Sequence, residues 1–560
     1  MLSKVLLVFL SITSALSEVT INLPDGRIRG VEKLSLRNRT YYAFLQVPYA
    51  EPPLGKLRFR DPRHVQPWSG ILDATQEKKI CYQVSSNSAL ENEDCLYLNV
   101  YTPVKYNAKN TRSSLPVMFY IHGGGFMNGN SLYSTIRPHH FMDNNVIVVT
   151  ISYRLGPFGF LSTGDYVIPG NYGLKDQNMA LKWVKRNIEY FGGDPNKVTI
   201  FGQSSGAVSV GYHIISKQSE GLFRGAIQQS GSVLAPHGYQ RRAKDFAYTL
   251  AKLIDPTFSE SSDSWDLLVL LQNATAEQID AATETFTQAP GSLILSDGSW
   301  FAPVIENDHE DAFITERMYG SLEKGNFNKV PLVVGMTSEE GIGHAADLEA
   351  FKLTVEQFDN NLTFFVQADM HIADLTRKTQ AGEAIRKIYT DGLLKDNLGQ
   401  AVKYFTDFSI SRPVIKHAEL QSAYSSVYFY QFSYHGALGG NNVSVEGAGR
   451  VGHSEDMRYL WTFSDSQSIQ DIDAKDLQVL DRHVKMFTDF AKTLNPTPGH
   501  LRTKKNSAQN IKWCKVNATQ NFTYLDIDER LTLKINPKEP AYSRWVSFYD
   551  TWAIPPFDTY

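Results

Sequence analysis

Several features that mark particular protein classes are scarce in this chain of 560 residues. It contains only 3 cysteines, which excludes a scaffold held together by many disulfides. Its 55 basic and 59 acidic residues give a formal net charge of -4, with no basic run, so we expect no nucleic-acid partner. After the amino terminus, no apolar run approaches the roughly 20 residues of a membrane-spanning helix. We therefore expect no integral membrane segment.

Apolar residues are plentiful, and their spacing predicts an α/β fold. They make up 42% of the chain, which is enough for a large core. Continuous β-branched runs predict buried strands, and helical spacing predicts helices. The expected strands are Leu115–Ile121, Val146–Tyr153, Val198–Phe201, Val330–Gly335 and Val427–Tyr434, and the expected helices are Asp176–Tyr190 and one containing Tyr542, Trp545, Val546 and Tyr549. This alternation predicts a mostly parallel, doubly wound sheet with helices on both faces and reactive groups at its carboxyl edge.

The first 17 residues have the pattern of a secretory signal peptide. Lys4 supplies the positive charge, Val5–Ile12 the apolar segment, and Ala15-Leu16-Ser17 the small residues before a cut ahead of Glu18. The alternative, an amino-terminal membrane anchor, is disfavoured because the apolar run is too short to cross a bilayer. No repeat or low-complexity linker divides the rest, so we expect a secreted, extracellular protein with a single domain over 18–560.

The cysteines and glycosylation sequons fit that compartment. Cys81 and Cys95 enclose a short polar loop that an oxidising environment would allow to close, contributing about 3 kcal/mol in the loop-entropy model. Cys514 has no obvious partner and is predicted to be a buried free thiol rather than an intermolecular bridge. The candidate N-glycosylation sites are Asn38, Asn273, Asn361, Asn442, Asn517 and Asn521.

A candidate nucleophile follows the predicted strand Val198–Phe201. The next residues are Gly202-Gln203-Ser204-Ser205-Gly206, and a helical pattern begins directly after them. Small residues at both ends of G-x-S-x-G permit a very tight strand-to-helix turn, which exposes the serine hydroxyl. This setting predicts that Ser204 is a catalytic nucleophile.

Oxyanion donors are expected in the glycine cluster His122-Gly123-Gly124-Gly125, at the end of the strand Leu115–Ile121. Bare glycines allow main-chain N–H groups to approach an oxygen closely. We assign Gly124, Gly125 and the N–H of Ser205 as the oxyanion hole. His122 is expected to fix the loop rather than to act as the base, because it precedes the nucleophile. A phosphate-binding loop is excluded because no Gly-Lys-Ser/Thr follows.

The acid and the base should follow the serine along the chain, in that order. Glu339 and Glu340 lie just after the predicted strand Val330–Gly335, and either carboxylate can orient an imidazole there. Two histidines, His435 and His453, come after the last predicted strand. The residues alone leave both choices open.

No metal or cofactor is indicated. The sequence has no His-Glu-x-x-His, no Cys-x-x-Cys pair and no dinucleotide-binding glycine pattern. Adjacent His139 and His140 are interpreted as a loop pair rather than as ligands. The predicted chemistry needs only water, and no pattern indicates an oligomeric state.

At this point a resemblance adds to the residue-level argument. The chain resembles the type-B carboxylesterases, the cholinesterase-like branch of the α/β-hydrolases, over nearly its whole mature length. The matching stretches are Val47–Gly55 with Leu57-Arg58-Phe59, Glu93–Val100, the His122 glycine cluster, Asn171–Gln177, and Phe191–Pro195 leading to the serine. In that family the acid is the glutamate directly before a glycine, and the histidine lies in a Gly-x-x-His-x-x-Asp/Glu pattern. The resemblance therefore implies Glu340 and His453, an ion pair between Glu93 and Arg154, and a Cys81–Cys95 disulfide.

Positions at which the chain departs from the family reduce the range of expected substrates. The cholinesterases carry a tryptophan that stacks on quaternary ammonium where this chain has Ser85, so a choline ester is disfavoured. Position 203 is glutamine rather than the glutamate common in the family. A glutamine at this site resembles secreted insect esterases, including those acting on juvenile hormone. Ser205 replaces an alanine and keeps the main-chain N–H.

The sequence thus predicts a secreted serine carboxylesterase that hydrolyses a small-molecule ester through an acyl-enzyme. Odorant or pheromone, xenobiotic and hormone esters are all candidate substrates. The alternatives are a juvenile hormone esterase, a lipase acting at a lipid interface, and a non-catalytic adhesion relative. The presence of Ser204, Glu340 and His453 disfavours the last.

Overall fold

The computed structural model describes residues 18–84, 86, 88–105, 114–259, 261–289, 298–466, 468–499, 511–517 and 521–560. The predicted signal peptide at 1–17 and position 85 lie outside the described residues.

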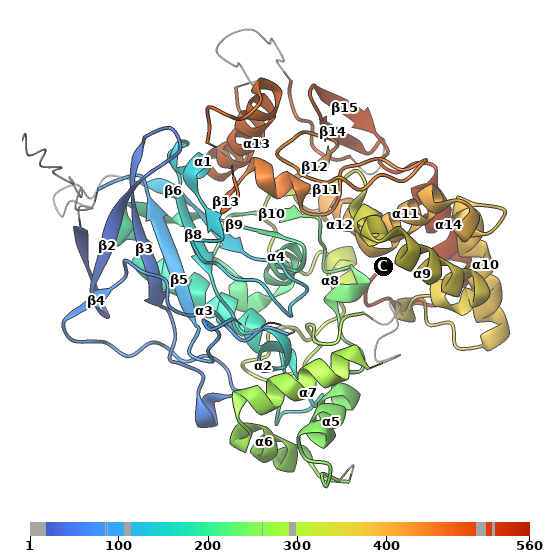
Figure 1. Cartoon of the computed structure of the whole chain (residues 1–560), viewed down its shortest axis with the longest axis horizontal. Coiled ribbons are helices and arrows are strands. Elements are labelled where there is room, and N and C mark those ends of the chain that lie inside the picture. Colours follow the sequence, from blue (N-terminus) through green and yellow to red (C-terminus); the bar gives the residue numbers. More distant parts are fainter. Residues whose placement is uncertain are drawn as a thin grey trace, which may run out of the picture.

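The described residues form one sheet of 13 strands, in the order β1-β2-β3-β5-β8-β6-β9-β10-β11-β12-β14-β15, with β4 beside β2 (Figure 1). From β8 to β14 every neighbouring pair is parallel, and the antiparallel pairs lie toward the two ends. The strands are β1 (Glu18–Leu23), β2 (Gly26–Leu34), β3 (Thr40–Pro48), β4 (Ile71–Asp73), β5 (Tyr97–Thr102), β6 (Leu115–Ile121), β8 (Ile147–Ile151), β9 (Gly193–Gln203), β10 (Gly225–Gln229), β11 (Leu332–Thr337), β12 (Val427–Phe432), β14 (Thr523–Ile527) and β15 (Leu531–Ile535), and a separate pair is formed by β7 (Ile136–Arg137) and β13 (Thr462–Phe463).

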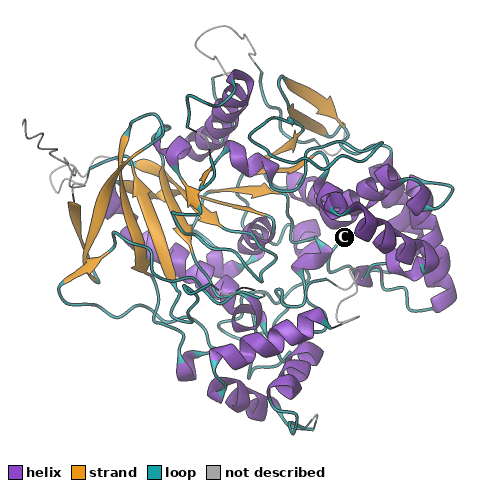
Figure 2. Ribbon diagram, in the orientation of Figure 1, coloured by secondary structure: helices purple, strands orange, loops and turns teal. Residues whose placement is uncertain are grey.

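Helices surround this sheet (Figure 2). Figure 1 shows α5, α6 and α7 gathered below the sheet and α9, α10, α11 and α14 gathered at the right of the view. The helices are α1 (His139–Met142), α2 (Gly156–Phe160), α3 (Tyr172–Asn187), α4 (Ser205–Ile215), α5 (Ala243–Ile254), α6 (Ser264–Asn273), α7 (Ala276–Gln288), α8 (Met318–Lys324), α9 (Leu348–Asn360), α10 (Leu375–Tyr389), α11 (Leu398–Thr406), α12 (Arg412–Ser422), α13 (Ala474–Thr493) and α14 (Ala541–Trp552).

The two faces of the sheet pack in separate cores. Val117 and Phe119 of β6 belong to one buried cluster together with side chains of α3 and α4. Met118 and Tyr120 of the same strand belong to a second cluster, which includes Phe487 of α13. Because successive strand residues point to opposite faces, helices cover both faces of the sheet. The predicted α/β-hydrolase architecture is confirmed.

The predicted elements are found with small shifts at their ends. The strand predicted at Leu115–Ile121 is β6 with the same bounds, whereas the strand predicted at Val146–Tyr153 is trimmed at both ends to β8. The helix predicted from Asp176 begins at Tyr172, directly after Asn171, whose left-handed φ of 59° starts the turn.

The ion pair expected between Glu93 and Arg154 is not formed. Glu93 accepts two hydrogen bonds of 2.6 Å from the guanidinium of Arg58. Arg154 instead donates from Nε and Nη2 to Asp176 of α3, at 2.7 Å each. Each carboxylate is thus matched by two parallel bonds from a nearer arginine, which is the favoured geometry. Both arginines and Glu93 nevertheless line one small cavity beside the disulfide.

The cysteine predictions are confirmed in part. Cys81 and Cys95 form a disulfide. Cys514 is a free thiol as expected, but it is only half-buried. Its neighbour Trp513 and nearby Val516 take the interior positions in this extended segment, which leaves Cys514 facing partly outward.

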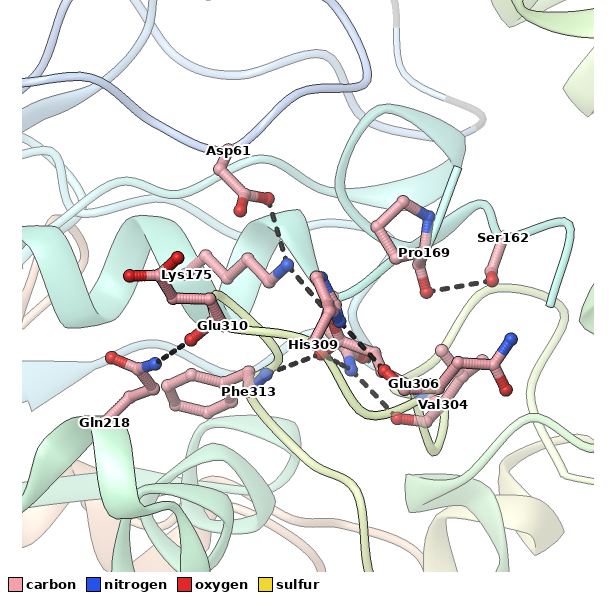
Figure 3. Close-up of polar contacts among 12 residues, drawn as sticks. Asp61, Ser162, Pro169, Lys175, Gln218, Val304, Glu306, His309, Glu310 and Phe313 are labelled. Carbon is pink, nitrogen blue, oxygen red and sulfur yellow. Dashed lines mark hydrogen bonds and ion pairs between the residues drawn. The ribbon is translucent and has the colours of Figure 1, made fainter. Parts of the chain in front are cut away.

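A second buried ion pair fixes a long loop to α3. The Lys175 ammonium lies 2.9 Å from Glu306 and 3.0 Å from Asp61. Figure 3 draws both contacts as dashed lines. Glu306 also accepts hydrogen bonds from the Asn171 side chain, at 2.8 Å, and from the N–H of Phe313, at 2.9 Å. The carboxylate therefore ties residues 304–314 to the helix.

The buried Arg154–Asp176 pair provides a test of what holds this part of the fold. Asp176→Asn removes one charge and leaves the guanidinium uncompensated, so we expect it to lower the free energy of unfolding by about 3–5 kcal/mol. The matched control is Glu349→Gln, which breaks the exposed pair with Lys352 and should cost less than about 1 kcal/mol. Urea unfolding followed by tryptophan fluorescence measures both. Equal midpoints for the two variants would contradict a structural role for the buried pair.

Candidate active site

Ser204 lies at the junction of β9 and α4, on the carboxyl edge of the sheet. Its φ of 58° and ψ of -128° are strained for a residue with a side chain. Its N–H donates to the Gln229 carbonyl at the end of β10, at 2.9 Å, and its carbonyl accepts from the N–H of Val208 in α4. The turn is therefore held from both sides. Ser204 is half-exposed, as expected of a nucleophile at such a turn.

The glycines of the motif are required by crowding. A Cβ on Gly202 would lie 2.5 Å from backbone of Gly206, and a Cβ on Gly206 would lie 2.1 Å from the Ile121 carbonyl oxygen. Neither contact can be relieved, because the neighbouring atoms belong to the backbone. The G-x-S-x-G pattern thus has the steric cause that the sequence suggested.

The glycine loop after β6 packs against the serine. A Cβ on Gly123 would lie 3.0 Å from the Ser204 Cβ. Gly124 and Gly125 have positive φ values of 107° and 63°. Among the described residues, the N–H groups of these two glycines have no hydrogen-bond partner. Ser205 is the first residue of α4, where N–H groups also lack a partner within the helix.

His122 fixes this loop. Its Nδ1 lies 2.8 Å from the Gly123 carbonyl oxygen, and its ring stacks on Tyr153 at 4.4 Å. The Tyr153 hydroxyl donates to the His122 carbonyl. Burial lowers the pKa of His122 to about 4, so the ring is neutral at ordinary pH. These contacts agree with the loop-fixing role predicted for it.

The structure brings Glu340 and His453 together. Glu340 follows β11 and is buried, and its Oε2 lies 2.6 Å from His453 Nδ1. Its other oxygen accepts from the N–H of Thr337 at 2.7 Å. Of the two alternatives left open by the residues, Glu339 packs against Gly449, and His435 is exposed just beyond β12.

The surroundings of Glu340 and His453 shift both pKa values. Burial lowers the pKa of His453, but the charge and hydrogen bond of Glu340, helped by the charge of Asp456, raise it more. The net pKa lies above the ordinary 6.5 of histidine. For Glu340, burial raises the pKa, and the interactions with His453 bring it below its ordinary value. The imidazole is 33% exposed, so it remains open to a substrate.

The other imidazole nitrogen faces a residue that sequence reasoning did not assign to the site. Gln203 Nε2 lies 3.1 Å from His453 Nε2 and donates to the Ser454 hydroxyl at 2.7 Å. In the described part of the chain, no hydrogen bond joins Ser204 to His453. Catalytic hydrogen bonds of unliganded enzymes are often long and tighten only with substrate. An amide side chain next to the serine in the motif was the available signal.

Asp456 was also missed. It is buried behind His453, where its Oδ2 accepts from Gln229 at 2.8 Å and from the Tyr430 hydroxyl at 3.0 Å. Burial raises the pKa of Asp456 to about 6. A polar residue three positions after the histidine gave a hint of this second carboxylate.

His139 and His140 were interpreted as a loop pair, but they begin the short helix α1, and the two rings make separate contacts. His139 Nε2 lies 3.2 Å from the Tyr133 hydroxyl, and His140 Nε2 lies 3.3 Å from the Thr462 hydroxyl. Within the described ranges, no group of three or more His, Cys, Asp or Glu side chains is arranged to hold a metal ion. Nor does any helix in those ranges have the length and apolar character needed to cross a membrane.

Comparison with known proteins shows which family the chain belongs to. The model of the carboxylesterase family matches residues 17–545. The chain belongs to the carboxylesterase family. Venom carboxylesterase-6 of Apis mellifera is 41% identical over 330 residues, 58% of this chain and 57% of that protein. A carboxylic ester hydrolase of Bombus ignitus is 32% identical over 552 residues, 94% of this chain and 92% of its own.

A solved structure agrees along most of the chain. The juvenile hormone esterase of Manduca sexta superposes with a TM-score of 0.81 and 27% identity, over 95% of this chain and 100% of that one. This carboxylesterase is a carboxylic ester hydrolase with the α/β-hydrolase fold.

Two neighbouring glycines allow a test of the predicted oxyanion loop. Gly124→Ala places a Cβ 2.0 Å from the Asn128 carbonyl oxygen, so the loop must move and kcat should fall by about 10²–10³-fold. Gly125→Ala meets no atom within 4 Å and bears only the strain of its φ, about 1–2 kcal/mol, so its kcat should fall by about 30-fold at most. Steady-state hydrolysis of p-nitrophenyl acetate measures both. Equal losses would argue against Gly124 as the donor at the reacting oxygen.

Proposed function

We propose that this protein is a secreted serine carboxylesterase that hydrolyses small-molecule carboxylic esters through an acyl-enzyme on Ser204. The observation that carries the proposal is the 2.6 Å hydrogen bond between Glu340 and His453, at the sheet edge where Ser204 follows β9. A buried carboxylate that holds an imidazole at the same sheet edge as a half-exposed serine is the arrangement of a charge-stabilised general base.

In the first half of the reaction, Ser204 attacks the ester carbonyl. His453 Nε2 takes the proton from the Ser204 hydroxyl as the oxygen–carbon bond forms, and Glu340 stabilises the resulting imidazolium. The same proton then passes to the leaving alcohol as the ester carbon–oxygen bond breaks. The acyl group remains on Ser204.

In the second half, water replaces the alcohol. His453 takes a proton from the water as its oxygen attacks the acyl carbon, and then returns it to Ser204 as the carboxylic acid leaves. The substrate oxygen becomes negative in both halves. The N–H groups of Gly124, Gly125 and Ser205 are the proposed donors to it.

The relatives support a covalent mechanism and an ester substrate. The Manduca sexta juvenile hormone esterase was solved with OTFP covalently attached. A juvenile hormone ester and the interfacial esters of a lipase are the alternative substrates. Hydrolysis of short acetates, a juvenile-hormone-type methyl ester and an emulsified triglyceride by the purified protein distinguishes the three.

Secretion is supported by the surface of the chain. All six asparagines of the sequons are exposed, where an oligosaccharide has room. The Cys81–Cys95 disulfide fits an oxidising compartment. Glycan release from protein secreted by cultured cells, followed by mass spectrometry, tests both the compartment and the occupied sites.

The first test is removal of the nucleophile. Ser204→Ala keeps a small residue at the strained turn and should reduce kcat by at least about 10⁴-fold, because the hydroxyl that forms the covalent bond is gone. Hydrolysis is measured alongside labelling by an organophosphate, which should attach to Ser204 in the unaltered protein alone. Wild-type turnover by the variant would remove Ser204 from the mechanism.

The second test is the pH profile of kcat/KM. His453 accepts a proton only when neutral, and its pKa is raised above 6.5. Activity should therefore be full at higher pH and fall as the pH drops through a value above 6.5. A profile that stays flat down to pH 4 would mean that His453 is not the base.

A further inference from the structure

Gln203 makes the contact with His453 that the proposed mechanism assigns to Ser204. The proton-accepting nitrogen of His453 is Nε2, because Nδ1 is bound to Glu340. That Nε2 lies 3.1 Å from Gln203 Nε2, and the amide bonds Ser454 at the same time. The side chain that directly precedes the nucleophile thus caps the base.

The contact is compatible with only one form of the imidazole. An amide NH₂ group donates hydrogen bonds and cannot accept them. With the amide placed as it is, His453 Nε2 must carry a lone pair and Nδ1 must carry the proton that faces Glu340. This is the neutral tautomer that the proposed mechanism requires of the base.

The amide is also confined. A Cβ on Gly123 would lie 3.2 Å from Gln203 Oε1, so the amide oxygen faces the glycine loop while the nitrogen faces His453. Gln203 is buried. The Gln203 side chain therefore lies between the glycine loop and His453.

We propose that Gln203 is a positioning residue that caps His453 Nε2 in the free enzyme and yields this nitrogen to Ser204 when an ester binds. The proposal rests on the proposed function, since it assigns a resting partner to the base named there. The Ser454 hydroxyl provides a second anchor, because a hydroxyl both donates and accepts and can follow a rotation of the amide.

Other titratable groups face His453 from the surrounding elements. Glu340 approaches from the end of β11 and Asp456 from the helical turn Glu455–Tyr459, and both favour the charged imidazole. His237, in the turn Pro236–Gly238 after β10, and His344, in the turn Glu340–Ala346, have lowered pKa values. Burial is the main cause for both. Both rings therefore titrate at lower pH than His453, whose pKa is raised. Glu340 and Asp456 stabilise the charged imidazole, whereas the uncharged amide of Gln203 stabilises the neutral one.

The test is the acid limb of kcat/KM in Gln203 variants. Gln203→Leu removes the donor that stabilises the neutral ring, so the limb should move to higher pH by about 0.5–1 pH unit, the worth of one hydrogen bond. Gln203→Glu places a negative charge on the imidazolium and should move the limb further, by more than about 1 pH unit. A merely structural glutamine would lower activity equally at every pH.

A matched control separates this effect from general damage. Gln177 is another buried glutamine whose amide bonds a histidine, His213, at 3.1 Å, and a serine, Ser209. Gln177→Leu should leave the acid limb where it lies in the unaltered enzyme. An acid limb of Gln203→Leu that coincides with that of the unaltered enzyme would overturn the proposal.

A second measurement does not depend on turnover. The ring protons of His453 are followed by NMR across pH in Ser204→Ala and in Ser204→Ala with Gln203→Leu, with assignment by His453→Gln. The double variant should titrate at higher pH. If Ser204→Ala keeps its activity, the proposed function fails whatever the NMR shows; if the two titrations agree, only the role of Gln203 fails.

Discussion

The strained conformation of Ser204 is the constraint on which the rest of the site depends. β9 lies between β6 and β10 in the parallel part of the sheet, so its end is flanked by the ends of both neighbours. β6 continues into the glycine loop, and the last residue of β10 holds the Ser204 N–H. The energy stored in one residue is balanced by contacts from three strands, which is how such conformations persist. The site therefore exists only as part of the assembled sheet.

Much of this was available from local sequence patterns. The buried strands were visible as apolar runs, and the elbow was visible because Gly202 and Gly206 have a steric reason to be glycine. Local patterns did not identify the residue that acts as the acid. Glu339 and Glu340 are adjacent on one loop, and only the direction of the chain after β11 decides which carboxylate reaches His453. The family resemblance made that choice, and the structure shows the same contact.

Two of the contacts that were mispredicted or missed join parts of the chain that are well separated in sequence. Gln203 meets a histidine 250 residues away, and Glu93 takes Arg58 rather than Arg154. The Glu93–Arg154 pair came from the family resemblance, and neither that resemblance nor periodicity tells which of several arginines comes nearest to a carboxylate. Cys514 shows the same limit at short range, since its exposure is set by which neighbours fill the interior.

The spacing of the reacting groups along the chain has a consequence for biosynthesis. His453 lies 113 residues after its carboxylate partner and is among the later parts of the chain to be made. A ribosome-bound fragment can present the serine turn well before the imidazole exists, and until β12 joins the sheet the base has no fixed place. In the proposed mechanism, the growing polypeptide therefore cannot hydrolyse an ester before residue 453 has been made and the Glu340–His453 contact has formed.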